Sequence, residues 1–188
     1  MKKGKLIVIV APSGTGKSTL IERLKSDFPM LSWSVSCTTR NMRPGEVNGV
    51  NYHFITKEDF EHRIKKDEFV EWALVHSNYY GTSKAFVQAG LDQGLHLLFD
   101  IDVQGADNIK KAFGHNAHVI FIEPPSVDEL KARLLKRATD PLHIIEERVN
   151  NAVKELERKG DFDHLVMNDD MDLAYKKLHT IFTKIIGN

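Results

Sequence analysis

The feature that most constrains this chain is a short apolar run that leads directly into a glycine-rich loop. Residues 6–10 read Leu-Ile-Val-Ile-Val, which predicts a buried strand. The next nine residues combine two glycines with a Lys-Ser-Thr ending: Ala11, Pro12, Ser13, Gly14, Thr15, Gly16, Lys17, Ser18 and Thr19. The pattern that follows predicts a helix ending before Pro29. A strand, a tight loop and a helix in this order form the first unit of a parallel α/β sheet.

A loop of this composition is suited to bind the phosphates of a nucleoside triphosphate. Its glycines let successive backbone N–H groups converge on phosphate oxygens, and the helix start adds the positive end of its dipole. We expect Lys17 to neutralise the β- and γ-phosphates and the hydroxyl of Ser18 to hold Mg²⁺. Ala11 stands where the usual pattern has its first glycine, so its φ must be negative. The alternative, a glycine-rich turn without a ligand, does not explain the Lys-Ser-Thr ending.

Composition limits the partners and the location of the chain. Its 188 residues correspond to one domain with room for inserted lobes, and 26 Lys+Arg balance 26 Asp+Glu. This balance predicts neither a nucleic-acid nor a membrane partner. The single cysteine, Cys37, excludes an intramolecular disulfide and fits a reducing compartment. Because no apolar stretch is long enough for a membrane span or a signal peptide, we expect a cytoplasmic protein.

Short apolar runs alternate with helical patterns along most of the remaining chain. Further strands are predicted at 95–101, 118–122 and 165–167, and further helices at 103–113, 126–137, 141–159 and 171–186. The stretch 34–80 differs, because it contains short β-like pieces at 33–36, 52–55 and 68–75 separated by turns. We therefore predict an α/β fold of the phosphate-loop type, with a parallel sheet flanked by helices and a small mixed α/β lobe inserted after the first helix.

The inserted lobe must supply the second substrate, because a phosphate loop identifies only the phosphoryl donor. Arg40 and Arg43 follow a run of hydroxyl side chains and precede Tyr52. Guanidinium groups match phosphate oxygens in a bidentate geometry. A lone arginine is ordinarily a solvated surface residue, but two beside hydroxyl groups favour a phosphate site.

Motifs along nearly the whole chain resemble the guanylate kinase family. They are Ser-Val-Ser-x-Thr-Thr-Arg from Ser34, Arg-Pro-Gly-Glu-Val-Asn-Gly from Arg43, Tyr52, Phe-Val-Glu-Trp-Ala from Phe69, Asn-Tyr-Tyr-Gly-Thr from Asn78 and Asp-Ile-Asp-x-Gln-Gly from Asp100. Arg137-Ala-Thr-Asp with Arg148 resembles the family's lid, and 162–169 resembles its segment near the adenine. Ala138 and Pro141 depart from the lid pattern.

The resemblance implies a role for each matching residue. The GMP phosphate would be bound by Arg40, Arg43, Tyr52 and Tyr80, and the guanine by Ser36, Glu71, Thr82 and Asp102. ATP would be bound by the loop residues 11–19 with Arg133 and Asn168, and the catalytic set would be Lys17, Arg40, Arg137 and Arg148. Asp100 is a second candidate metal ligand whose role stays open. Alternation alone would turn Glu71 toward solvent, but a carboxylate there can accept hydrogen bonds from guanine N1–H and its amino group.

The implied function is Mg²⁺-dependent transfer of the γ-phosphoryl group of ATP to GMP, and to dGMP, in purine nucleotide metabolism. A phosphate monoester is largely dianionic at neutral pH, so no general base is needed. We expect three regions: a core at 1–33, 84–125 and 160–188, a GMP-binding lobe at 34–83, and a lid with flanking helices at 126–159. The lid would close over the triphosphate only when both substrates are bound.

The sequence leaves open two alternative functions and the question of a homodimer. A protein-binding module that has lost catalysis would not need Lys17 and Ser18, and a kinase for another phosphorylated metabolite would not need Glu71, Asp102, Ser36 and Thr82. The small-molecule partners are ATP and GMP, and a homodimer is left open.

Overall fold

A computed structural model describes residues 4–75, 77–137 and 141–187, and at Arg137 it describes the backbone alone. The chain forms two compact units. The first unit comprises the residues up to Ile7 together with Met30–Ala117, and the second comprises Val8–Pro29 with the residues from His118 onward.

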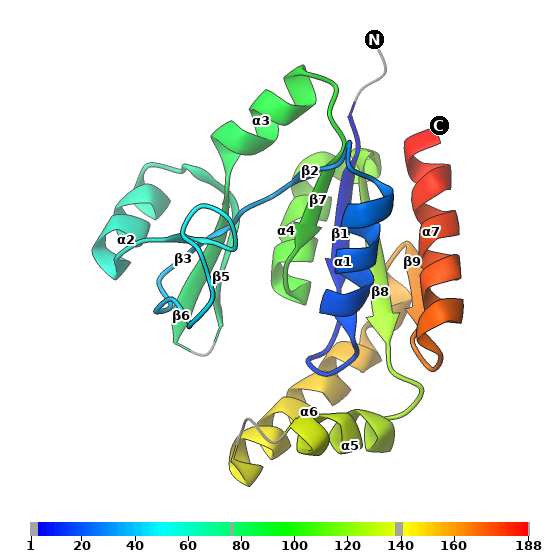
Figure 1. The fold of residues 1–188 in the computed structure, drawn as a ribbon. Coiled ribbons are helices and arrows are strands. Elements are labelled where there is room, and N and C mark those ends of the chain that lie inside the picture. Colours follow the sequence, from blue (N-terminus) through cyan, green and yellow to red (C-terminus); the bar gives the residue numbers. More distant parts are fainter. Residues whose placement is uncertain (1–3, 76, 138–140, 188) are drawn as a thin grey trace. The chain divides into compact units, whose positions relative to one another are not determined.

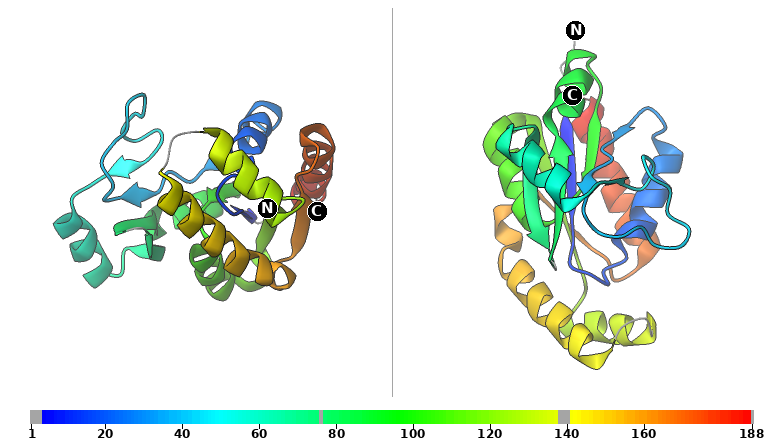
Figure 2. Two further views of the ribbon diagram at one scale, coloured as in Figure 1. Left: turned by 90° about the horizontal axis from the view of Figure 1, so that it is seen from below. Right: turned by 90° about the vertical axis from the view of Figure 1, so that its left-hand side faces the viewer.

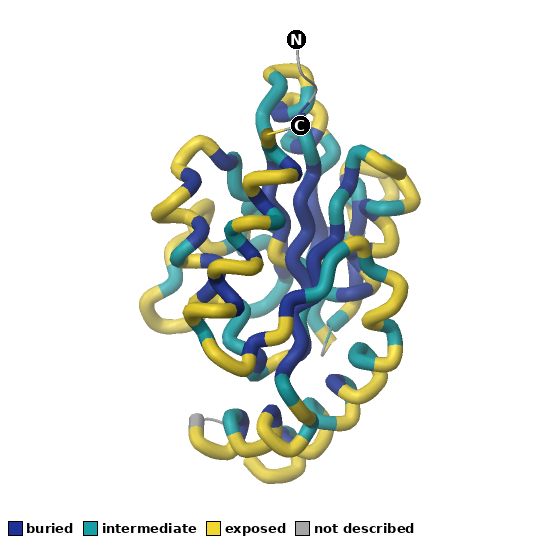
Figure 3. Tube along the Cα trace, turned by 90° about the vertical axis from the view of Figure 1, so that its right-hand side faces the viewer, coloured by how far each residue is buried: buried dark blue, intermediate teal, exposed yellow. Residues whose placement is uncertain are grey.

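The main sheet has five strands in the order β2-β7-β1-β8-β9 (Figure 1). Their bounds are β1 Leu6–Val10, β2 Ser32–Trp33, β7 Leu97–Asp100, β8 Ala117–Glu123 and β9 His164–Met167. The β2–β7 and β8–β9 pairs are parallel, as the alternation of strands and helices predicts. Every residue of β1 is fully buried, and Figure 3 shows the buried residues following the strands. The strands predicted at 95–101, 118–122 and 165–167 are confirmed with small shifts of their ends.

The first unit carries a second, mixed sheet in the order β4-β3-β6-β5. Its strands are β3 Cys37–Thr38, β4 His53–Phe54, β5 Phe69–Val75 and β6 Asn78–Ser83, and the unit's helices are α2 Lys57–Lys65, α3 Lys84–Asp92 and α4 Val103–Phe113. The predicted mixed lobe is confirmed, with Cys37, Phe60 and Phe69 in its core. The strand expected at 33–36 is wrong, because only Ser32–Trp33 is extended and it pairs with β7 of the main sheet.

The second unit contains α1 Lys17–Asp27, α5 Val127–Arg137, α6 Leu142–Glu157 and α7 Met171–Gly187. Helices α5 and α6 lie side by side in both views of Figure 2, joined by a small core of Leu130, Leu134, Ile145 and Ala152. Ser126 caps α5 by accepting the Glu129 N–H at 3.0 Å.

The helix predicted at 141–159 is shorter than expected. It ends at Glu157, and a 3₁₀ turn follows at Lys159–Asp161. Pro141 is its N-cap residue, and Asp140 lies outside the described residues. Within the described ranges, no helix is both long enough and apolar enough for a membrane span.

Candidate active site

The glycine-rich loop between β1 and α1 has the conformation that its sequence predicts. Gly14 and Gly16 have φ values of 95° and 87°, in the region that favours glycine. Thr15 is fully buried, and both its hydroxyl (2.9 Å) and its N–H (3.3 Å) donate to the Pro12 carbonyl. Among the described residues, only Asp67 and Ser77 combine a side chain with a positive φ, so Ala11 meets the condition set by its sequence. The hydroxyl of Thr15 therefore holds the loop from the inside.

Asn168, which follows β9, fixes the same loop from across the unit. Its side chain is buried, and Nδ2 donates to the Thr15 carbonyl at 2.5 Å. Its own N–H donates to Glu123 O at 2.8 Å, and its carbonyl accepts Nη1 of Arg133 at 3.1 Å. A Cβ on Gly16 would lie 2.6 Å from the Asn168 amide nitrogen, so only glycine allows this approach. The sequence placed Arg133 and Asn168 beside the loop, and the structure brings them together there.

A pocket of about 320 Å³ opens beside this loop. It is lined by Gly14, Gly16, Arg133, Asn168, Asp169 and Met171. Its volume is at the lower end of the range of small-molecule sites. Asp169 belongs to the segment 162–169 that the sequence resemblance places near the adenine. Met171 was not predicted from the sequence, and its one sequence signal is its position three residues after Asn168.

Helices α5 and α6 both reach the loop. A Cβ on Gly14 would lie 3.0 Å from Cδ2 of Leu134, so α5 packs closely on the loop. Nη1 of Arg148 donates to Ser13 Oγ at 3.2 Å. Arg148 of α6 thus contacts the loop directly, and the closing of the lid on binding of both substrates stays a prediction. Arg137 is the last residue of α5, and its side chain lies outside the described part of the chain, as does Ala138.

The first unit brings Ser36, Glu71 and Thr82 together in one buried chain of hydrogen bonds. Thr82 Oγ1 donates to Glu71 Oε1 at 2.6 Å, and Ser36 Oγ lies 3.5 Å from Thr82 Oγ1. Glu71 is 4% exposed, whereas its neighbour Trp72 is 42% exposed. The alternation of β5 therefore turns Glu71 inward, onto the face against which α4 packs, and not toward solvent.

The environment of Glu71 disfavours its charged form. Burial raises the pKa of its carboxyl from 4.5 to about 7, and the nearby Asp102 charge adds to this effect. The hydrogen bonds from Thr82 act in the opposite direction and favour the carboxylate. A ligand that donates hydrogen bonds to this carboxyl would therefore stabilise its charged form, which burial disfavours.

Asp102 lies beside this chain as the N-cap of α4. Its Oδ1 accepts the Gly105 N–H at 2.8 Å. Strand β7 ends at Asp100 and the chain turns there into the cap, so Asp100 and Asp102 do not lie on one strand. Asp100 is exposed at the end of β7, and its charge adds to burial in raising the pKa of Tyr52.

Gly105 makes the close packing around Glu71 possible; it ends the motif that begins at Asp100, but no role was predicted for it from the sequence. A Cβ at this position would lie 2.8 Å from Glu71 Oε2 and 3.1 Å from Ile101 Cδ1. Gly105 is in the first turn of α4, so the helix can approach the carboxyl only because this residue has no side chain.

Substitution of Gly105 tests that approach. Gly105→Ala is expected to raise the KM for the ligand predicted to bind at Glu71 by about tenfold, because the carboxyl must move away from Thr82. The better helix propensity of alanine, about 1 kcal/mol, offsets part of the crowding, so the fold is retained. Gly160→Ala is the matched control, since a Cβ added at Gly160 would have no described atom within 4 Å. An unchanged KM for Gly105→Ala would contradict the importance of the close packing.

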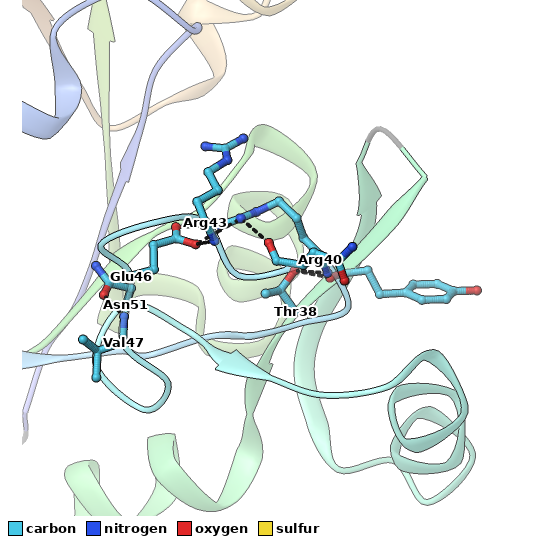
Figure 4. Close-up of polar contacts among 8 residues, drawn as sticks. Thr38, Arg40, Arg43, Glu46, Val47 and Asn51 are labelled. Atoms are coloured by element: carbon cyan, nitrogen blue, oxygen red, sulfur yellow. Dashed lines mark hydrogen bonds and ion pairs between the residues drawn. The ribbon is translucent and has the colours of Figure 1, made fainter.

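Arg40 lies among aromatic rings and carboxylate oxygens. Its guanidinium carbon is 5.5 Å from the ring centre of Tyr52 and 5.6 Å from that of Phe54. The Tyr52 and Tyr80 rings meet edge to face at 5.9 Å, and the contact with Glu46, followed by a smaller contribution from Tyr80, raises the pKa of Arg40. The structure thus groups Arg40, Tyr52 and Tyr80. Figure 4 shows the Arg43 side chain extending away from the carboxylate of Glu46.

Comparison with known proteins agrees with this arrangement. The model of the family described as guanylate kinase matches residues 3–185. A guanylate kinase of Rickettsia felis is 46% identical over 179 residues, covering 95% of this chain and 93% of the relative. One of Helicobacter hepaticus is 45% identical over 181 residues, covering 96% and 90%. The crystal structure of guanylate kinase from Anaplasma phagocytophilum superposes with a TM-score of 0.77 at 28% identity, covering 98% of this chain and 87% of that one.

Proposed function

Because this chain belongs to the guanylate kinase family and is an ATP:GMP phosphotransferase, we propose that its transfer reaction depends on Mg²⁺ and also accepts dGMP. The single observation that carries the base specificity is the buried carboxyl of Glu71, hydrogen-bonded to Thr82. The residues assigned to GMP address the base and the phosphate and not the sugar, which is why we extend the proposal to dGMP. The reaction would serve purine nucleotide metabolism in the cytoplasm.

In the acceptor half-site, Glu71 would accept hydrogen bonds from guanine N1–H and the exocyclic amino group. Ser36, Thr82 and Asp102 would complete the polar edge around the base. Adenine has no N1–H donor and would leave the carboxyl unpaired in a buried place, which costs about 1–3 kcal/mol. Arg40, Arg43, Tyr52 and Tyr80 would bind the phosphate.

In the donor half-site, the backbone N–H groups of the loop 11–19 would bind the ATP phosphates, and the pocket beside Asn168 and Arg133 would take the adenine. Lys17 would neutralise the β- and γ-phosphates, with Arg137 and Arg148 adding positive charge during transfer. We propose the regions 1–33, 84–125 and 160–188 as the core, 34–83 as the GMP-binding lobe and 126–159 as the lid.

The protein residues that fit Mg²⁺ are few, as is usual for an ion held mainly by substrate phosphates and water. The hydroxyl of Ser18 is exposed in the first turn of α1, which suits this role, and Asp100 is a second candidate. When bound, Mg²⁺ would neutralise charge on the β- and γ-phosphates.

The chemistry then requires positioning and charge neutralisation. A phosphate oxygen of GMP attacks the γ-phosphorus of ATP in line, the bond from that phosphorus to the β-phosphate oxygen breaks, and ADP and GDP leave. Since the second pKa of a phosphate monoester is about 6, the attacking oxygen carries no proton at neutral pH. Lys17 and the arginines stabilise the charge of the transferring group, and no covalent enzyme intermediate forms.

An ADP-release assay across GMP, dGMP, AMP, CMP and UMP tests this proposal. We expect turnover with GMP and dGMP, rates at least about a hundredfold lower with the other three, and loss of activity with a chelator that Mg²⁺ reverses. Comparable kcat/KM values for AMP and GMP would refute the guanine assignment. Full activity in the presence of chelator would refute the Mg²⁺ requirement, and inactivity with dGMP would refute the extension to it.

A further inference from the structure

The residues 43–46, Arg-Pro-Gly-Glu, form a tight turn that brings a carboxylate back to its own start. The Glu46 N–H donates to the Arg43 carbonyl at 3.1 Å, and Gly45 has a φ of 86°. Proline at the second position and a positive-φ glycine at the third are typical of a type II turn. The side chain of Glu46 is thereby held beside the backbone of Arg43.

One carboxylate in this turn binds parts of both arginines (Figure 4). Glu46 Oε1 accepts a hydrogen bond from Nη2 of Arg40 at 2.7 Å, and Oε2 accepts one from Nη1 of Arg40 at 3.1 Å. The same Oε2 accepts the backbone N–H of Arg43 at 2.7 Å. The side chains of Arg40 and Glu46 are only 13% and 18% exposed, so this bidentate ion pair is less screened by solvent than an exposed surface pair.

These contacts leave Arg40 with one defined edge for a ligand. Its Nη1 donates to the Asn41 carbonyl at 2.6 Å as well as to Glu46. Of the five guanidinium N–H donors, three are therefore directed to Glu46 and Asn41. The N–H of Nε and the second N–H of Nη2 form the other edge of the guanidinium. The rings of Tyr52 and Phe54 further restrict the orientation of the Arg40 guanidinium plane.

We infer that Glu46 is a positioning residue for the acceptor phosphate: it does not bind the phosphate but orients the Arg40 guanidinium and anchors the backbone of Arg43. This inference rests on the phosphate-binding roles proposed for those two arginines. Glu46 also adds one negative charge, which reduces the local positive field and by itself weakens the attraction of a phosphate. Orientation outweighs this cost, because a partly exposed charge is screened whereas a misoriented guanidinium loses both hydrogen bonds of its edge.

The test compares Glu46→Gln and Glu46→Ala with native protein, and uses Glu58→Gln, an exposed glutamate of α2, as the matched control. For Glu46→Gln we expect the KM for GMP to rise about tenfold, the KM for ATP to stay within twofold, and binding of guanosine, which has no phosphate, to stay within twofold. The alanine variant should show the same selectivity with a larger effect, and Glu58→Gln should match native protein.

Three results would overturn the inference. A lower KM for GMP would make Glu46 a competitor of the phosphate, an unchanged KM would make the pair irrelevant to binding, and parallel loss of guanosine binding would make Glu46 a general support of the lobe. Arg40→Ala distinguishes failure of the underlying proposal: if its KM for GMP is native, the phosphate role of Arg40 is wrong. In the Arg40→Ala background, Glu46→Gln should add less than twofold.

Discussion

Lys17→Ala is expected to lower kcat by at least about a thousandfold while leaving the affinity for GMP within about twofold of native. Lys17 is the first residue of α1, directly after Gly16, so its ammonium group belongs to the loop proposed to bind the triphosphate. Charge on the transferring phosphoryl group and on the β-phosphate changes during the reaction, and a fixed cation stabilises that transition state. The proposed GMP residues all lie in the other unit of the chain, which is why acceptor binding should persist.

Steady-state turnover and titration with GMP, measured on the same preparation, check this prediction. Lys25→Ala is the matched control, since Lys25 is an exposed lysine in the last turn of the same helix. Near-native turnover of Lys17→Ala would exclude the phosphate-loop mechanism. Loss of GMP binding together with turnover would mean that the substitution acts through folding.

Glu71→Gln is expected to weaken GMP binding by about 1–3 kcal/mol while making the protein itself more stable above pH 7. The carboxamide presents an N–H₂ donor where guanine also presents donors, so one hydrogen bond is replaced by a repulsive contact. Thr82 can still donate to the remaining oxygen, which preserves the local packing. Binding of GMP and turnover with a fixed ATP concentration measure the loss, and ATP affinity should be unchanged.

The stability effect of Glu71→Gln has a defined pH dependence. The pKa of Glu71 is about 7 in the folded protein and near 4.5 in the unfolded chain, so the folded state binds more protons between these values. Native protein therefore loses stability as the pH rises through this window, by up to about 3 kcal/mol, and the glutamine variant does not. Urea unfolding at pH 4.5 and pH 8 should show a gain for the variant only at the higher pH. Glu68→Gln, an exposed change next to the same strand, is the control, and an equal gain at both pH values would contradict the assignment.

The sequence alone determined the features that depend on neighbouring residues. The strand at 6–10, the loop after it, the helices at 103–113 and 171–186 and the mixed lobe all follow from local periodicity, turn residues and glycines, and the structure contains them. Local signals were insufficient at β3 and at 33–36, because a two-residue strand is defined by its partner and not by its own pattern. Helix α3 likewise lay outside the elements predicted.

Only the tertiary structure decided which groups meet. Alternation along β5 predicts two faces but not which one is buried, and the packing of α4, possible because Gly105 has no side chain, places Glu71 inside. The bond from Asn168 to Thr15 joins residues 153 positions apart, and no local pattern encodes it. Glu46 is near Arg40 in sequence, yet its role depends on the turn at Gly45 and on the rings beside Arg40. Such contacts arise from the assembled fold, since each is stabilised by burial and geometry that distant segments supply together.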